Sequence, residues 1–163
     1  MSHSPAVVSL AERLKIVPQI GTVEWIGLRP SRGVAVVPVD EVEAVADRGL
    51  VGDRYRANGT RQVTLIQAEH VPVIAGLAGH AVTPELLRRN LVVRGINLMS
   101  LQKQRFAIGE VVLLGTSTCA PCEKMETSIG EGTFQAMRGH GGLCAKIERG
   151  GLIRRGDRVR LLG

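Results

Sequence analysis

Short runs of hydrophobic residues, many of them alternating with polar ones, recur along most of the chain and are separated by Gly, Pro and Asn. This pattern is typical of short β-strands bounded by turns. We predict strands at residues 21–28, 34–39, 42–46, 62–67, 90–93, 110–115, 143–148 and 157–162. The last of these alternates apolar with basic residues, as a half-buried strand at a closing edge should. Residues 149–152 have the composition of a hairpin-type turn.

Helical spacing is confined to a few segments. It predicts helices at residues 69–77 and 83–89, the second with Pro84 at its first helical position. Residues 122–137 form an irregular helix-forming stretch that Gly130 and Gly132 interrupt. Residues 1–20 are predicted to be an N-terminal appendage, and residues 21–163 a single domain. Many short strands with few helices predict a mainly β fold, a β-barrel or a strongly coiled sheet, because closure removes exposed strand edges.

Size and hydropathy agree with one domain in an aqueous compartment. A chain of 163 residues with 44% hydrophobic residues can bury one core. It has no apolar run of the roughly 18 residues that a membrane-spanning helix requires. Glu12, Arg13 and Lys15 lie where a signal peptide would need an apolar block. We therefore expect a cytoplasmic protein without a membrane partner.

The formal net charge is +6, and arginine supplies nearly all of the basic excess. Arginine suits bidentate recognition of phosphate or carboxylate, so an anionic ligand is one explanation and a solvated basic surface is the other. Aromatic residues make up only 2% of the chain. Single-stranded nucleic acids usually bind on aromatic stacking platforms, so we do not expect a nucleic-acid partner.

The three cysteines are an odd number in a compartment expected to be reducing, which argues against a disulfide scaffold. One explanation is a structural zinc site made by Cys119, Cys122, His140 and Cys144. A second is a redox dithiol of Cys119 and Cys122. A third is a single reactive cysteine that binds a soft metal or carries sulfur. Cys144 lies in a strand pattern and could instead be a buried core thiol.

Cys122 has the most favourable local sequence for thiol chemistry. It follows a predicted strand and is expected at or near a helix N-terminus, where the backbone dipole favours a thiolate, with Lys124 close by. Three other segments combine Gly or Asn with arginine: residues 48–55, 88–91 and 138–143. They can be surface turns and solvated helix ends, or they can contact an anion through guanidinium groups and backbone amides.

Several of these motifs occur together in the order found in one family. They are Gly52-Asp53-Arg54, Gln62-Val-Thr-Leu-Ile66, Arg88-Arg89-Asn90-Leu91-Val92, Phe106-Ala-Ile108-Gly109-Glu110-Val111, Cys119-Ala-Pro-Cys122, Met137-Arg138-Gly139-His140-Gly141-Gly142 and Gly150-Gly151-Leu152-Ile153-x2-Gly156-Asp157-x-Val159. From residue 21 to residue 162 the chain resembles a stand-alone bacterial MOSC protein, a family named for the C-terminal domain of molybdenum cofactor sulfurases.

The resemblance implies a β-rich barrel whose cleft holds the molybdenum cofactor (molybdopterin) or carries sulfur on a cysteine. The family's cysteine matches Cys122, which would be the catalytic residue and metal ligand. Arg54, Arg89, Asn90 and Arg138 would then bind the cofactor or position the substrate. Family members include reductases of N-hydroxylated compounds, which implies a small-molecule substrate.

The chain lacks the family's additional domains, so electrons would come from a separate reductase. The alternative function is a sulfur carrier or cofactor-delivery module, in which a cysteine desulfurase would load a persulfide on Cys122. Many relatives have His where this chain has Tyr55. An acid or base role at that position is therefore not expected at neutral pH, given a reference tyrosine pKa of about 10.

Overall fold

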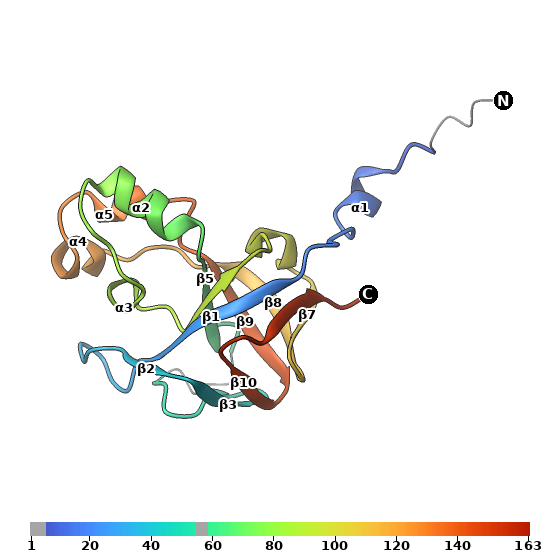
Figure 1. The fold of residues 1–163 in the computed structure, drawn as a ribbon, viewed down its shortest axis with the longest axis horizontal. Coiled ribbons are helices and arrows are strands. Elements are labelled where there is room, and N and C mark those ends of the chain that lie inside the picture. Colours follow the sequence, from blue (N-terminus) through green and yellow to red (C-terminus); the bar gives the residue numbers. More distant parts are fainter. Residues whose placement is uncertain (1–5, 55–58) are drawn as a thin grey trace.

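A computed structural model describes residues 6–54 and 59–163, and its organising element is a closed β-barrel (Figure 1). Its strands are β1 (Gly21–Leu28), β2 (Val37–Val39), β3 (Glu41–Val45), β4 (Gly49–Leu50), β5 (Val63–Gln67), β6 (Leu91–Arg94), β7 (Arg105–Ile108), β8 (Val111–Thr118), β9 (Leu143–Arg149), β10 (Gly151–Arg154) and β11 (Arg158–Leu161). The helices are α1 (Leu10–Arg13), α2 (His70–Ala78), α3 (Pro84–Leu87), α4 (Lys124–Ser128) and α5 (Thr133–Met137), with a 3-10 turn, η1, at Leu98–Leu101.

Seven strands close the barrel in the order β11-β7-β8-β9-β5-β6-β1, because β1 also pairs with β11. Strand β2 extends the sheet from β1, and β10, β3 and β4 form a separate small sheet. Pairing is antiparallel except between β5 and β6. The mainly β fold and the barrel predicted from the sequence are confirmed.

Two hydrophobic cores lie on opposite sides of the barrel wall. Leu65 and Leu91 belong to the inner core, whereas their neighbours Ile66 and Val92 belong to a second core that includes Met137 of α5. Successive side chains of a strand point to opposite faces, so β5 is buried along its whole length. The second core therefore fixes the helices against the outside of the barrel.

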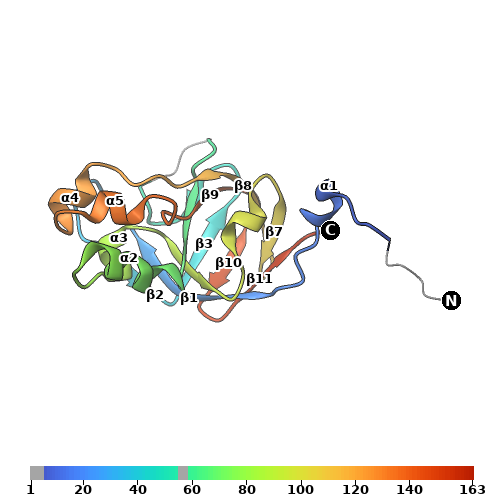
Figure 2. The same cartoon turned by 90° about the horizontal axis from the view of Figure 1, so that it is seen from above.

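The helices α2 to α5 gather at one side of the barrel, while the arm that carries α1 projects from the other (Figures 1 and 2). Helices α2 and α3 lie in the crossover between the parallel strands β5 and β6, and α4 and α5 lie between β8 and β9. Helix α1 buries none of its residues. None of the helices in residues 6–54 and 59–163 is long and apolar enough to cross a membrane.

The structure differs from the sequence predictions at several element ends. The helix predicted at residues 83–89 ends at Leu87, because Arg88 adopts a left-handed conformation with φ of 56°. The chain does turn at Gly150, but the hairpin-type pairing is wrong, since β10 pairs with β3 of the small sheet. Strand β7 was not predicted, although it lies between β11 and β8 in the barrel.

Candidate functional site: an arginine-rich cleft at Cys122

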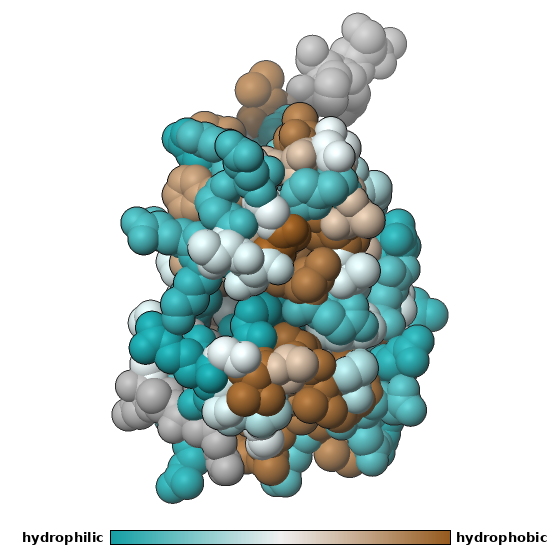
Figure 3. Space-filling model, turned by 90° about the vertical axis from the view of Figure 1, so that its left-hand side faces the viewer, coloured by the Kyte–Doolittle hydropathy of each residue, from teal (hydrophilic) through white to brown (hydrophobic). Residues whose placement is uncertain are grey.

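A cleft of about 530 Å³ opens beside the helical side of the barrel. Its walls come from the segment before β2, the segment between β4 and β5, helix α3 and helix α4 with the loop before it. Figure 3 faces this side and shows a hollow with hydrophilic side chains inside and hydrophobic ones above and below it. The lining includes six cationic side chains and one carboxylate, together with a thiol: Arg32, Arg54, Arg61, Arg88, Arg89, Lys124, Glu85 and Cys122.

Cys122 is exposed and lies in the loop that joins β8 to α4. Its carbonyl oxygen accepts a hydrogen bond of 3.0 Å from the amide of Met125, which is buried in the second core. This bond anchors the loop at the cleft wall. Helix α4 begins two residues later, at Lys124, and has only five residues. The cysteine therefore precedes a short helix, as the sequence predicted, with its thiol open to the cleft.

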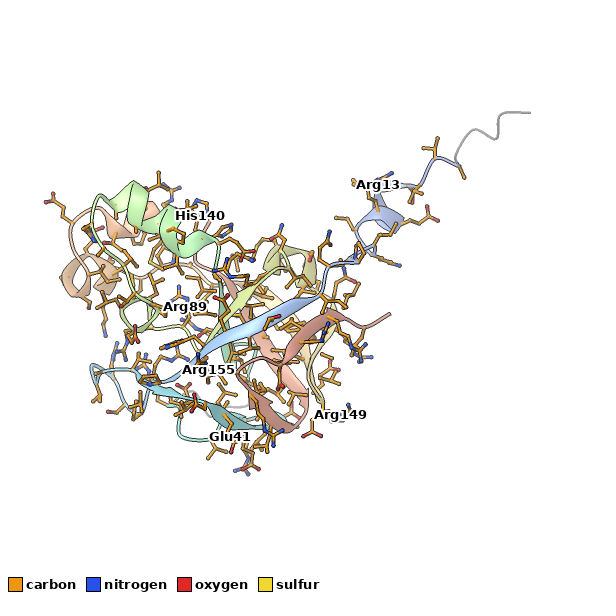
Figure 4. All side chains as sticks on the ribbon, in the orientation of Figure 1. Arg13, Glu41, Arg89, His140, Arg149 and Arg155 are labelled. Atoms are coloured by element: carbon orange, nitrogen blue, oxygen red, sulfur yellow. The ribbon has the colours of Figure 1, made fainter. Side chains whose placement is uncertain are left out.

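Arg89 holds the loop that leads to Cys122. The residue is only 3% exposed and lies inside the protein, near α3 (Figure 4). Its Nε donates to the carbonyl of Gly141 at 2.9 Å and its Nη1 to that of Leu87 at 3.1 Å. Its Nη2 donates to the carbonyls of Cys119 and Ala120, both at 3.4 Å. Burial lowers the pKa of Arg89, but a guanidinium keeps its proton in proteins.

Asn90 lies in a fully buried network next to the cleft. Its Oδ1 accepts from Arg29 Nη2 at 2.9 Å and from the amide and hydroxyl of Thr64 at 3.0 and 3.2 Å. Its Nδ2 donates to Asp53 Oδ1 at 3.2 Å and to the carbonyl of Gly27 at 3.0 Å. The Oδ1 and Nδ2 atoms of Asn90 are thus both hydrogen-bonded within the protein, and the side chain connects the ends of neighbouring strands. Asn90 does not line the cleft.

The same network contains an ion pair that sequence reasoning missed. The Asp53 carboxylate accepts hydrogen bonds from Arg29 Nε at 3.2 Å and from Arg29 Nη2 at 3.1 Å, and both residues are buried. Asp53 is therefore no surface-turn carboxylate; it binds the end of β1 to the segment after β4. Arg29 follows a strand and precedes Pro30 without any motif around it, so only the fold reveals its role. Arg54, the next residue in the Gly-Asp-Arg motif, does line the cleft.

The other two thiols form a buried pair. The side chains of Cys119 and Cys144 are hydrogen-bonded to each other, which lowers the pKa of Cys119 to about 6. Burial opposes this shift, and the positive charge of Arg89 assists it. The same hydrogen bond, together with burial, raises the pKa of Cys144. The interaction thus favours a thiolate at Cys119 over one at Cys144.

The alternative sites proposed for the cysteines are not assembled. Within the described residues, no three His, Cys, Asp or Glu side chains are placed to hold a metal ion. The zinc site of three cysteines and one histidine is therefore wrong. Its histidine, His140, instead makes an edge-on contact with His70, with ring centroids 4.9 Å apart. The Cys119–Cys122 dithiol also fails to form, since Cys119 is buried against Cys144 while Cys122 is exposed.

The glycine-rich segment after α5 packs tightly and does not bring its arginine to the cleft. Arg138 is exposed, donates to Gln135 Oε1 at 3.0 Å and is absent from the cleft lining. A Cβ atom at Gly141 would collide with the carbonyl oxygen of Cys119. The glycine thus permits the close approach on which the Arg89 hydrogen bonds depend. Tyr55 lies outside the described residues.

The family model of the MOSC domain matches residues 28–160. The chain belongs to the MOSC family. Among solved structures, this MOSC protein is similar to the YuaD protein of Bacillus subtilis, with a TM-score of 0.78, 19% identity, and coverage of 88% of this chain and 97% of that one. No curated protein sequence matches the chain.

Two structures of YiiM share the same MOSC fold. The Escherichia coli protein has a TM-score of 0.67 and 19% identity, with coverage of 87% of this chain and 70% of that one. The Geobacillus stearothermophilus protein has a TM-score of 0.71 and 15% identity, with coverage of 88% and 75%. At these identities the likeness establishes the fold.

Proposed function

We propose that this MOSC protein binds the molybdenum cofactor in the arginine-rich cleft and reduces N-hydroxylated small molecules with electrons from a separate reductase. The observation that carries the proposal is the exposed Cys122 thiol on the wall of a cleft lined by six cationic side chains. A soft metal ligand and a set of anion-binding groups thus share one cavity.

The residues of the cleft suit this cofactor. A thiolate is a soft ligand of the kind that suits a metal of this class, and guanidinium groups such as that of Arg54 bind phosphate oxygens bidentately. The cleft volume of about 530 Å³ lies within the range of roughly 300–1,000 Å³ that ligand sites occupy. Apolar side chains, Val36, Leu86 and Met125 among them, line the same cavity and would exclude water from a flat ring system.

The reaction would break the N–O bond of the substrate. Two electrons and two protons convert an N-hydroxylated amine or amidine into the corresponding N–H compound and water. The bound cofactor would supply the two-electron chemistry. The chain itself would orient the substrate, keep the Cys122 loop in place through Arg89, and present Lys124 as a hydrogen-bond donor to the oxygen that leaves as water. The electron donor would be a separate reductase protein.

Metal analysis of protein purified from a cofactor-competent host tests the proposal. The wild type should retain roughly one molybdenum per chain and reduce benzamidoxime when supplied with a reductase. Cys122→Ser should retain at least ten times less molybdenum with an unchanged melting temperature, because the exposed thiol contributes little to the core. A folded wild type that takes up no molybdenum on reconstitution would refute the role.

Exposure of Cys122 also supports a second function, that of a persulfide carrier. A cysteine desulfurase would transfer one sulfur atom from its own persulfide to the Cys122 thiolate. The intact mass should then rise by one sulfur in the wild type and stay constant in Cys122→Ser. A wild-type mass that never changes would eliminate this function, and molybdenum analysis is unaffected by that outcome.

A further inference from the structure

Helix α4, which follows Cys122, is too short to be stable by itself. It has five residues, whereas isolated helices of fewer than about 12–15 residues are marginal in water. Its first residue, Lys124, lines the cleft, and the amide of Met125 donates to the carbonyl of Cys122 at 3.0 Å. The position of the Cys122 thiol therefore depends on the contacts that hold α4 against the rest of the protein.

Glu126 of α4 makes such a contact with α5. Its Oε2 accepts a hydrogen bond of 2.8 Å from the amide of Gly132, and its Oε1 accepts one of 2.7 Å from the amide of Phe134. These amides lie at the start of α5, where the capping residue is Gly132 and has no side chain that could accept a hydrogen bond. The two helices lie side by side (Figures 1 and 2). The carboxylate of α4 thus supplies the cap that α5 lacks.

Helix α5 is itself firmly placed. Thr133 at its start is fully buried, and the Thr133 hydroxyl lies 3.2 Å from Nε2 of His80, just after α2. Met137 at its end is buried in the second core, against the outside of the barrel. A continuous set of contacts therefore runs from the barrel wall through α5 and Glu126 to α4 and Cys122.

We infer that Glu126 is a positioning residue for Cys122. By binding the start of α5, its carboxylate fixes α4 and thereby keeps the thiol at the place on the cleft wall where it would meet the metal. Glu126 does not line the cleft, so it acts through α4 and not by contact with cofactor or substrate. The inference rests on the proposed function and adds to it a residue outside the cleft.

A nitroxide spin label on Cys122 tests the inference without any cofactor. Cys122 is exposed, whereas Cys119 and Cys144 are buried, so a methanethiosulfonate label should react with Cys122 selectively. Glu126→Gln keeps the size of the side chain but replaces one acceptor oxygen with an NH2 donor, which cannot accept from a backbone amide. The electron paramagnetic resonance spectrum of Glu126→Gln should gain a mobile component that the wild type lacks, and Glu126→Ala should gain it too.

Two control variants separate positioning from stability. Glu12→Gln changes a carboxylate that accepts from the amide of Ser9 at 2.9 Å, but it does so on the projecting arm that carries α1. Val159→Ala leaves a cavity in the inner core at β11 and so destabilises the whole protein. Neither variant should give the mobile component.

Molybdenum retention provides the functional readout in protein loaded in a cofactor-competent host. At a temperature where every variant is folded, Glu126→Gln should retain about tenfold less molybdenum than the wild type, the scale of loss found when residues that orient metal ligands are changed. Val159→Ala and Glu12→Gln should retain the wild-type amount.

The inference and the proposed function fail in different ways. An unchanged label spectrum in both Glu126 variants would overturn the positioning role, and so would a mobile component that also appears in Val159→Ala. A mobile label with unaltered molybdenum retention would overturn it as well, because the position of the thiol would then not matter. A wild type that takes up no molybdenum would refute the proposed function, whereas a mobile component confined to the Glu126 variants would still uphold the placement of Cys122 by Glu126.

Discussion

The carboxylate of Asp53 accepts two hydrogen bonds from the guanidinium of Arg29, from Nε at 3.2 Å and from Nη2 at 3.1 Å, and both side chains are almost completely buried. Arg29 Nη1 also donates to the carbonyl of Arg88, which lines the cleft. The pair therefore joins the end of β1 to two segments that form the cleft wall. A buried pair of this kind is sensitive to the loss of either partner, because the remaining charge stays buried without compensation.

We expect Asp53→Asn to lower the free energy of unfolding by about 3–5 kcal/mol, as for other broken buried ion pairs. Urea denaturation monitored by circular dichroism measures this change. Glu41→Gln is the control, because Glu41 pairs with Arg154 on the surface, with more than half of each side chain exposed. That substitution should cost no more than about 1 kcal/mol. Equal effects of the two variants would contradict the structural role of Asp53.

Arg89 should be required for both stability and the site, since its donors reach the carbonyls of Gly141, Leu87, Cys119 and Ala120. Arg89→Ala leaves these carbonyls without a hydrogen-bond donor. Each carbonyl that water does not reach should then cost about 1–3 kcal/mol of unfolding free energy. We expect a loss of at least about 3 kcal/mol in unfolding free energy and, in protein that remains folded, reduced molybdenum retention.

Arg89→Lys and Arg138→Ala separate charge from geometry in the same measurements. The lysine variant keeps the positive charge but lacks the planar fork of donors, so it should recover only part of the lost stability. Arg138→Ala removes an exposed cation whose side chain donates to Gln135, and it should change neither quantity. A full rescue by lysine would show that charge alone matters at this position.

The buried thiol pair should make stability depend on pH. The pKa of Cys119 is lowered to about 6 from a reference value of 9.0, mainly by the hydrogen bond from Cys144. Its thiolate therefore contributes stability that is fully present above pH 9 and is lost as the pH falls toward 6. Urea midpoints across this range should rise with pH in Cys122→Ser protein and should rise less when Cys119→Ser is added.

Ultraviolet absorbance of thiolate provides the direct titration of the same group. In Cys122→Ser protein a step should occur with a midpoint near 6, the value expected for Cys119. Cys144→Ala removes the thiol donor, so the midpoint should move to higher pH. A midpoint that does not change in this variant would show that the neighbouring arginines, and not Cys144, stabilise the thiolate.

Gly142 should tolerate no side chain, whereas Gly139 should tolerate one at a moderate cost. Both have positive φ, 96° and 81°, but a Cβ atom at Gly142 would collide with the carbonyl oxygen of Leu65 and one at Gly139 would meet nothing within 4 Å. Gly139→Ala should cost about 1–2 kcal/mol, the backbone strain alone. Gly142→Ala should cost at least twice as much, measured as urea unfolding, because β5 or the segment after α5 must move.

The sequence predicts the barrel well because its signals are local. Alternation and turn residues mark most strands, and Pro84 marks the start of a helix. Strand β7 escapes this reasoning because its last three residues, Phe106, Ala107 and Ile108, are all buried and show no alternation of apolar and polar side chains. The hairpin-type pairing at Gly150 is wrong because partner choice depends on the distant strand β3.

The site residues likewise differ in whether local sequence or distant contacts determine their position. Cys122 and Arg54 lie where their motifs suggest, at loops that open into one cleft. Asn90 and Asp53 belong to the same motifs, yet their side chains are used for internal hydrogen bonds across 24 to 63 residues of sequence. Residue type alone does not distinguish a ligand-binding amide from a buried structural one. Arg29 and the Cys119–Cys144 pair depend entirely on contacts that the barrel creates.

Closure of the barrel by β1 and β11 has a consequence for biosynthesis. Gly21 of β1 pairs with Val159 of β11. The first barrel strand to leave the ribosome therefore keeps one edge uncovered until the last strand has been synthesised. Until then β1 lacks its β11 neighbour, and exposed strand edges pair readily with other chains. Ribosome-bound intermediates that lack β11 should therefore be the aggregation-prone species, and the yield of this protein in cells should respond to chaperones that shield nascent strands.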